Sequence, residues 1–194
     1  MTKIILTKDC SGNNPFFMGY YPDIISFYRK PSLKVGDIGN RYGNLFPVHA
    51  ESSCVLEKIK NDKEIYFLQK FYLLYNERGL VKDISLESFD NFDSGLGGYF
   101  VFSKKQLKNI FDFQRVSRKR MSKKRKKEIV NFLTNLVYGY SCFFNENIYN
   151  ILLEKDGEVV NSIDFVFNKN KEELINESKK YFDLVEFKFE DQTI

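Results

Sequence analysis

Apolar residues recur along the chain in short blocks, and several of these blocks predict β-strands. Lys3–Thr7 is short and rich in β-branched residues, as expected of an opening strand. Ile148–Glu154 and Glu158–Phe167 flank Lys155-Asp156-Gly157, a sequence typical of a tight hairpin turn. Two further segments are predicted strands: Tyr99–Phe102 and the alternating run Leu184–Phe189.

Other blocks have apolar residues at helical spacing. The clearest is Ile129–Val137, in a helix that Ser122 is suited to cap and that is expected to end near Tyr138, before Gly139. Ser103 is likewise suited to cap a second helix. Helices are also predicted for three other segments: Pro22–Tyr28, a stretch from about His49 to Lys60, and Asn170–Tyr181.

The dense apolar and aromatic run Glu64–Tyr75 fits either a buried strand or a buried helix, and its length slightly favours a helix.

Taken together, the pattern predicts an α+β fold with a mostly antiparallel sheet, helices packed on it and a C-terminal ββαβ segment. With 194 residues, the chain is expected to form a single compact domain over 1–194. The best candidate for a seam is 90–98, where an acidic loop meets a glycine-rich segment.

Charge is distributed unevenly along this chain of net charge +4. Arg115–Lys127 holds nine basic residues and no acidic one, whereas the remainder holds 21 basic and 26 acidic residues. Five of these cations fall in the first turns of the predicted helix that follows Ser122. Cations there oppose the helix dipole and repel one another, at roughly 0.3–1 kcal/mol each for the dipole contribution.

An anionic partner would relieve both penalties, and nucleic-acid phosphates or an acidic protein surface would serve equally well. The alternative is a basic face that is simply solvated and screened by salt. The stretch contains no aromatic residue for base stacking, so contacts to nucleic acid are expected to be made to phosphates. The predicted binding residues are Arg115, Arg118, Lys119, Arg120, Lys123, Lys124, Arg125, Lys126 and Lys127.

His49 is the only histidine, and His49-Ala50-Glu51 resembles the first half of the signature of zinc-dependent nucleoside and base deaminases. In that family the histidine binds zinc and the glutamate moves protons. The second half, a Pro-Cys-x-x-Cys that supplies two thiolates, is missing here. A structural role for His49 and Glu51 at a helix start is therefore favoured, with Glu51 near the positive end of the dipole.

Asp164 followed by Glu186-Phe187-Lys188 resembles the metal-binding acidic residue and the Glu-x-Lys of metal-dependent nucleases. Those nucleases normally carry further core elements after this strand, and this sequence ends at Ile194. Alternating charge on a solvent-facing strand explains the same letters, and short motifs often match by chance. The nuclease resemblance is therefore kept as an alternative only.

Three cysteines, Cys10, Cys54 and Cys142, show no paired spacing, which indicates reduced thiols. No segment has the length of a secretory signal or a membrane span, so a cytoplasmic protein that needs no membrane is expected. We predict a non-catalytic protein without cofactor or metal that docks on RNA, DNA or a nucleoprotein complex, for example as an inhibitor or regulator of a nucleic-acid-handling enzyme. The alternative is a metal-dependent enzyme acting on nucleic acid through one of the two resemblances above.

Overall fold

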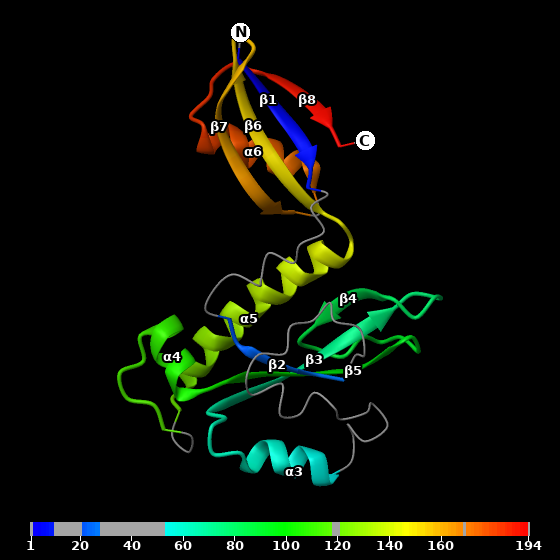
Figure 1. Cartoon of the computed structure of the whole chain (residues 1–194), viewed down its shortest axis with the longest axis vertical. Helices are drawn as coiled ribbons and strands as arrows, with labels where there is room; N and C mark the ends of the chain where they lie inside the picture. The colour runs from blue at the N-terminus through cyan, green and yellow to red at the C-terminus, as the bar shows by residue number, and fades with distance from the viewer. Residues whose placement is uncertain (1, 10–20, 28–52, 118–120, 169, 194) are drawn as a thin grey trace. The chain divides into compact units, whose positions relative to one another are not determined.

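The structure is a computed structural model that describes residues 2–9, 21–27, 53–117, 121–168 and 170–193. It contains two four-stranded sheets with helices, and seven of its strands pair in antiparallel fashion (Figure 1). The predicted α+β class and the C-terminal strand-strand-helix-strand order are confirmed. The chain divides into two compact units, Phe16–Tyr138 and Met1–Pro15 together with Gly139–Ile194. That one domain spans the chain stays a prediction.

The unit Phe16–Tyr138 is built on a fully antiparallel sheet of strand order β2-β5-β3-β4. Helix α3 lies against one face, and helix α4 with the first part of α5 lies against the other (Figure 1). Aromatic rings of β5, α4 and α5 meet on that second face. The elements are β2 (Asp23–Ser26), α3 (Ser53–Asn61), β3 (Phe67–Tyr75), β4 (Val81–Ser85), β5 (Ser94–Phe102), α4 (Lys104–Phe111) and α5 (Lys123–Phe144).

Two predicted helices in this unit are strands. The Pro22–Tyr28 prediction was wrong for Asp23–Ser26, which forms β2 and pairs with β5, because buried Ile24 and Ile25 fit the sheet. The helix favoured for Glu64–Tyr75 was also wrong, since Phe67–Tyr75 is β3. This strand pairs on both sides and is covered by helices on both faces, which removes the polar alternation that usually marks a strand.

Strand β5 is longer than predicted, because its glycines let the backbone of β2 and side chains of β3 lie close to it. A Cβ on Gly97 would lie 2.5 Å from the side chain of Leu73, and a Cβ on Gly98 would lie 2.0 Å from the carbonyl oxygen of Ile25. The glycine-rich segment taken as a candidate seam therefore belongs in part to the central strand of a sheet. Only glycine leaves room for β2 and β3 at these two positions.

The other unit has a sheet of order β7-β6-β1-β8, in which β8 alone runs parallel to its neighbour β1. Helix α6 contributes Leu174 to a core that includes Ile4, Leu6 and Ile151. The predicted hairpin is confirmed, with positive φ at both Asp156 and Gly157 as a two-residue turn requires. The elements are β1 (Thr2–Lys8), β6 (Ile148–Lys155), β7 (Glu158–Phe167), α6 (Lys171–Tyr181) and β8 (Lys188–Gln192).

Two predicted boundaries in this region were wrong. The last strand begins at Lys188 rather than Leu184, because Leu184 and Phe187 pack on the core from the turn that follows α6. Helix α5 does not end at Tyr138 but continues through buried Gly139 to Phe144. Buried residues such as Tyr140 extend the apolar face beyond the glycine, so tertiary packing outweighs its low helix propensity.

Replacing Gly98 with Ala is expected to lower the free energy of unfolding by about 3 kcal/mol, because the new methyl group overlaps the Ile25 carbonyl. Gly95→Ala is the matched control in the same strand, since a Cβ there meets nothing within 4 Å. It should change stability by less than about 0.5 kcal/mol. Urea denaturation of both variants measures the difference, and equal stabilities would contradict this account of β5.

Candidate functional site

Helix α4 presents three lysines on its outer side. Ser103 caps its start: the hydroxyl accepts from the Gln106 backbone N–H at 3.2 Å, and the Gln106 side chain accepts from the Ser103 N–H at 2.8 Å. Leu107 is buried beneath the helix. The outer residues Lys104, Lys105 and Lys108 are exposed, and the first turn holds no acidic residue.

Helix α5 begins with a second group of cations. As predicted, Ser122 caps this helix, since its hydroxyl accepts from the Arg125 backbone N–H at 3.3 Å and its carbonyl from that of Lys126 at 3.1 Å. The first turn again lacks an acidic residue. Four lysines of the first turns are exposed: Lys123, Lys124, Lys126 and Lys127.

Arg125 differs from these lysines because its side chain is used within the protein. Its guanidinium lies over the ring of Phe113 at 4.7 Å from the centroid, and it donates a hydrogen bond to the carbonyl oxygen of Arg115 at 2.5 Å. Successive helical residues are about 100° apart, so Arg125 projects opposite the middle of the arc that carries the four lysines. Arg125 therefore holds the helix start against the loop and leaves the lysines directed outward.

An aromatic cluster supports both lysine-bearing helices. Phe111 of α4 packs on Phe132 of α5 and on Phe102 of β5, at centroid distances of 5.3 and 5.8 Å. Phe113, which carries the Arg125 guanidinium, stacks on Phe111 at 5.2 Å. Each such pair adds roughly 0.5–1.5 kcal/mol beyond the burial of its area. The cluster thus fixes α4 beside the first turns of α5 (Figure 1).

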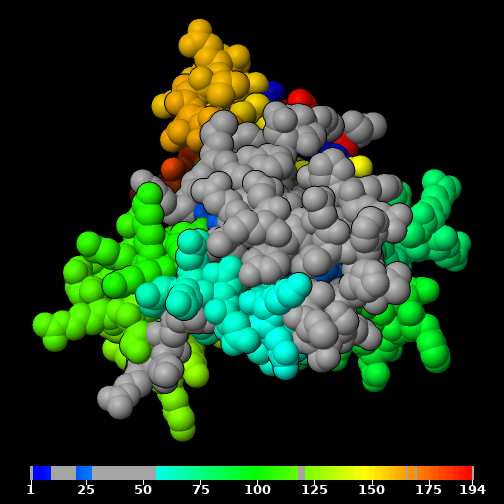
Figure 2. Space-filling view, turned by 60° about the horizontal axis from the view of Figure 1, so that its bottom comes forward, coloured from blue at the N-terminus to red at the C-terminus, as the bar shows by residue number. Residues whose placement is uncertain are grey.

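The two helix starts and the described part of their connection form one basic surface, which we name by its sequence range, 104–127. Figure 2 shows α4 and the start of α5 on one flank, with long side chains projecting outward. In the sequence, this range holds twelve basic residues and one acidic residue, Asp112. Within the described part of the chain, no ion pair engages Arg115 or any of the seven described lysines of the basic surface.

Several lysines of the other unit are neutralised by carboxylates instead. Lys3 lies 3.1 Å from Glu154, and this hydrogen bond raises the pKa of Lys3. Lys171 lies 2.8 Å from Asp191, and its hydrogen bond is the largest cause that lowers the pKa of Asp191 to about 2. The lysines of α4 and α5 differ from these, because no carboxylate among the described residues forms an ion pair with them.

The structure brings most of the predicted basic residues together and adds three that the sequence analysis missed. Arg115 is exposed next to α5, whereas Arg118, Lys119 and Arg120 lie outside the described residues. The missed residues are Lys104, Lys105 and Lys108. The sequence does show that α4 is an amphipathic helix with lysines only on its polar side. Its packing beside α5 could not be predicted, because that depends on contacts between distant segments.

The residues of the two enzyme resemblances are not brought together among the described residues. His49 and Glu51 lie outside them. Asp164 is on edge strand β7, whereas Lys188 begins β8 at the opposite edge of the same sheet. Three strand spacings, about 14 Å, separate these two strands, and the two residues are also out of register along them. Glu186 is exposed in the turn before β8. In the described ranges, no group of three or more His, Cys, Asp or Glu side chains is placed to hold a metal ion.

Comparisons with protein-family models, curated proteins and solved structures find no match for this chain. Considering only the helices that the structure describes, none has the length and apolar character to cross a bilayer.

Replacing Arg125 with Gln should lower the free energy of unfolding by about 1–2 kcal/mol, because the cation–π contact and the hydrogen bond to Arg115 are lost together. Its neighbour Lys126 is the matched control. Lys126→Gln removes a cation from a helix start and should leave stability unchanged or slightly higher. Chemical denaturation of the two variants measures the two changes in the free energy of unfolding, which should differ in sign. Equal changes would show that Arg125 does not anchor the helix start.

Proposed function

We propose that the basic surface 104–127 binds the phosphates of nucleic acid, alone or within a nucleoprotein complex. The observation that carries the proposal is the gathering of exposed lysines from two helices with no carboxylate partner among the described residues. Like charges at i,i+3 and i,i+4 within one helix cost roughly 0.2–0.5 kcal/mol per pair, as for Lys123 and Lys127. A polyanion bound across the surface would relieve this repulsion for both helices at once.

Phosphates suit this surface better than base edges do. Apart from Arg115, the exposed cations of the described residues are ammoniums on long flexible stems, which act as point charges and do not read the planar edge of a base. The aromatic rings nearby, such as Phe111 and Phe113, are packed on one another and are not offered for stacking. Binding is therefore expected to depend strongly on salt and weakly on sequence.

The proposed role is binding without catalysis, as in an inhibitor or regulator of an enzyme that handles nucleic acid. No group of catalytic side chains accompanies the described lysines on this surface, whose single carboxylate, Asp112, accepts a hydrogen bond from Gln114 at 2.6 Å. The rest of the chain carries 18 basic and 25 acidic residues. This acidic remainder would repel a polyanion and confine its contact to the basic surface.

Changing Lys123, Lys124 and Lys126 to Gln should flatten the salt dependence of nucleic-acid binding. Each duplex phosphate neutralised contributes about −0.9 to the log–log slope and each single-strand phosphate about −0.7, so the triple variant should lose roughly two to three units of slope. Changing Lys104, Lys105 and Lys108 to Gln should produce a similar loss. Fluorescence anisotropy with duplex and single-stranded RNA and DNA across a salt series measures the slopes.

The matched control removes three exposed lysines elsewhere, Lys58, Lys63 and Lys188, and should keep the original slope. If the control variant and the α5 variant weaken binding equally, net charge rather than this surface is responsible. If the unmodified protein binds no nucleic acid at low salt, the phosphate proposal is wrong and an acidic protein surface becomes the better candidate partner.

A further inference from the structure

The lysines of the basic surface 104–127 lie in two rows, one on the outer side of each helix. On each helix two of them are four residues apart, Lys104 and Lys108 on α4 and Lys123 and Lys127 on α5. Side chains at this spacing lie on one side of a helix, with Cβ atoms about 5–6 Å apart. Adjacent phosphates of one strand rise by about 3.4 Å along a duplex, and the winding of the strand separates them by roughly twice that distance. Each row therefore matches two successive phosphates of one strand.

The aromatic cluster below the helices holds the two rows apart at a fixed distance. Phe111 of α4 and Phe132 of α5 have ring centroids 5.3 Å apart, and both rings also contact Phe102 of β5. The axes of helices packed in this way lie about 8–10 Å apart. This separation exceeds the distance between neighbouring phosphates of one strand. It is close to the width of the duplex grooves, about 6–12 Å, which separate the phosphates of two strands.

The basic surface offers no platform for the bases of a single strand. The only aromatic residues in its sequence range are Phe111 and Phe113. Phe113 is buried, and Phe111 packs against Phe102, Phe113 and Phe132. Proteins that hold single strands stack the bases on exposed aromatic rings. A duplex needs no such platform, because its bases are already stacked and both of its strands present phosphates, at about one charge per 1.7 Å.

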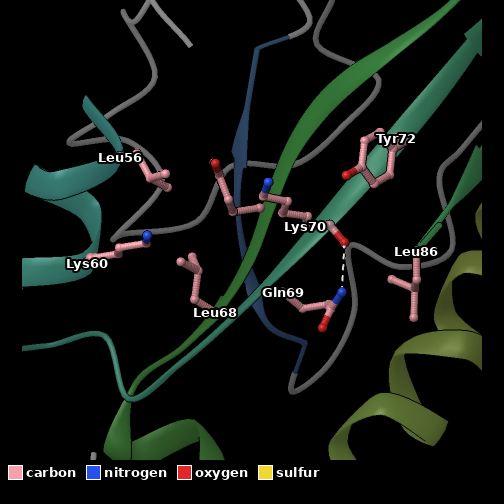
Figure 3. A pocket seen from close by; sticks show the side chains of 8 residues that line it. Leu56, Lys60, Leu68, Gln69, Lys70, Tyr72 and Leu86 are labelled. Atoms are coloured by element: carbon pink, nitrogen blue, oxygen red, sulfur yellow. Dashed lines mark hydrogen bonds between the residues drawn. The ribbon is translucent and has the colours of Figure 1, made fainter. Parts of the chain in front are cut away.

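The lysines around α3 do not form a comparable row. Residues 57–64 hold three basic and three acidic residues, so their charges cancel. A pocket of about 340 Å³ beside α3 and β3 is lined by leucines and by two lysines, Lys60 and Lys70 (Figure 3). Lys60 already interacts within the chain, and the single remaining lysine cannot follow a phosphate backbone. Among the described residues of this unit, the array of cations therefore lies at α4 and α5, which suits a stiff duplex that does not wrap around the protein.

We infer that the basic surface 104–127 binds double-stranded nucleic acid, with the α4 lysines on the phosphates of one strand and the α5 lysines on the phosphates of the other. The inference rests on the proposed function and adds to it the class of nucleic acid and the way it lies. A single strand could reach both rows only by bending across them, which costs conformational freedom. A duplex avoids this cost, because base pairing already holds its two backbones apart.

Fluorescence anisotropy of the full chain across a salt series tests the inference with three kinds of ligand. These are short DNA and RNA duplexes, their separate single strands, and the same duplexes with neutral methylphosphonate linkages in one strand. The intact duplex should bind at least tenfold more tightly than either single strand. Neutralising one strand should reduce the log–log salt slope by about half, because one row of lysines then meets no charged phosphate. These comparisons change the ligand and not the protein, so no loss of folding can produce them.

The variant with Gln at Lys123, Lys124 and Lys126 provides a second test. Its salt slope should be lower than that of the unmodified protein with the intact duplex. With one neutral strand, the two proteins should have nearly equal slopes, because the α4 row can take the remaining charged strand. The matched control with Gln at Lys58, Lys63 and Lys188 should behave as the unmodified protein with both ligands.

Two results would overturn the inference and leave the proposed function standing: single strands that bind as tightly as the duplex, or a salt slope that one neutral strand leaves unchanged. Either result means that only one backbone is contacted. If no nucleic acid binds at low salt, the proposed function is wrong and the inference fails with it. Tight binding of duplex DNA, of duplex RNA or of both agrees with the inference, and the ratio of the two affinities identifies the preferred helix form.

Discussion

The stack of the Arg125 guanidinium on Phe113 is the contact on which the basic surface depends. Seven described lysines lie on two adjoining helices, and their mutual repulsion opposes the packing of those helices and the formation of their first turns. A favourable contact beneath the lysines opposes this repulsion: Arg125 of the same basic group turns inward and lies over the ring of Phe113. Rings of Phe111, Phe132 and Phe102 continue this contact down to the sheet.

In this arrangement, aromatic packing supports a concentrated positive charge. Aromatic rings pack over large areas, and their faces also attract cations, so one cluster serves both as core and as support for Arg125. A cluster of leucines could fill the same volume but would give the guanidinium no favourable face. The charge of the surface and the aromatic packing below it therefore form one structural unit.

The two faces of the β2-β5-β3-β4 sheet differ in character. The face under α4 and α5 is closed by aromatic rings and carries its charge on the outside of helices. Next to α3, by contrast, apolar and polar lining groups meet around an open pocket, because β4 leaves part of the β3 edge uncovered.

The sequence by itself determined the features that depend on near neighbours: the caps at Ser103 and Ser122, the Asp156-Gly157 turn, the α+β class and the concentration of basic residues. These follow from local backbone chemistry and from counting charges. Tertiary structure decided what depends on distant segments. Burial on both faces made Phe67–Tyr75 a strand, close strands required Gly98, and aromatic packing joined Lys104, Lys105 and Lys108 to the α5 lysines. Hydrophobic periodicity cannot reveal such contacts, because it records how much of a segment is buried but not what buries it.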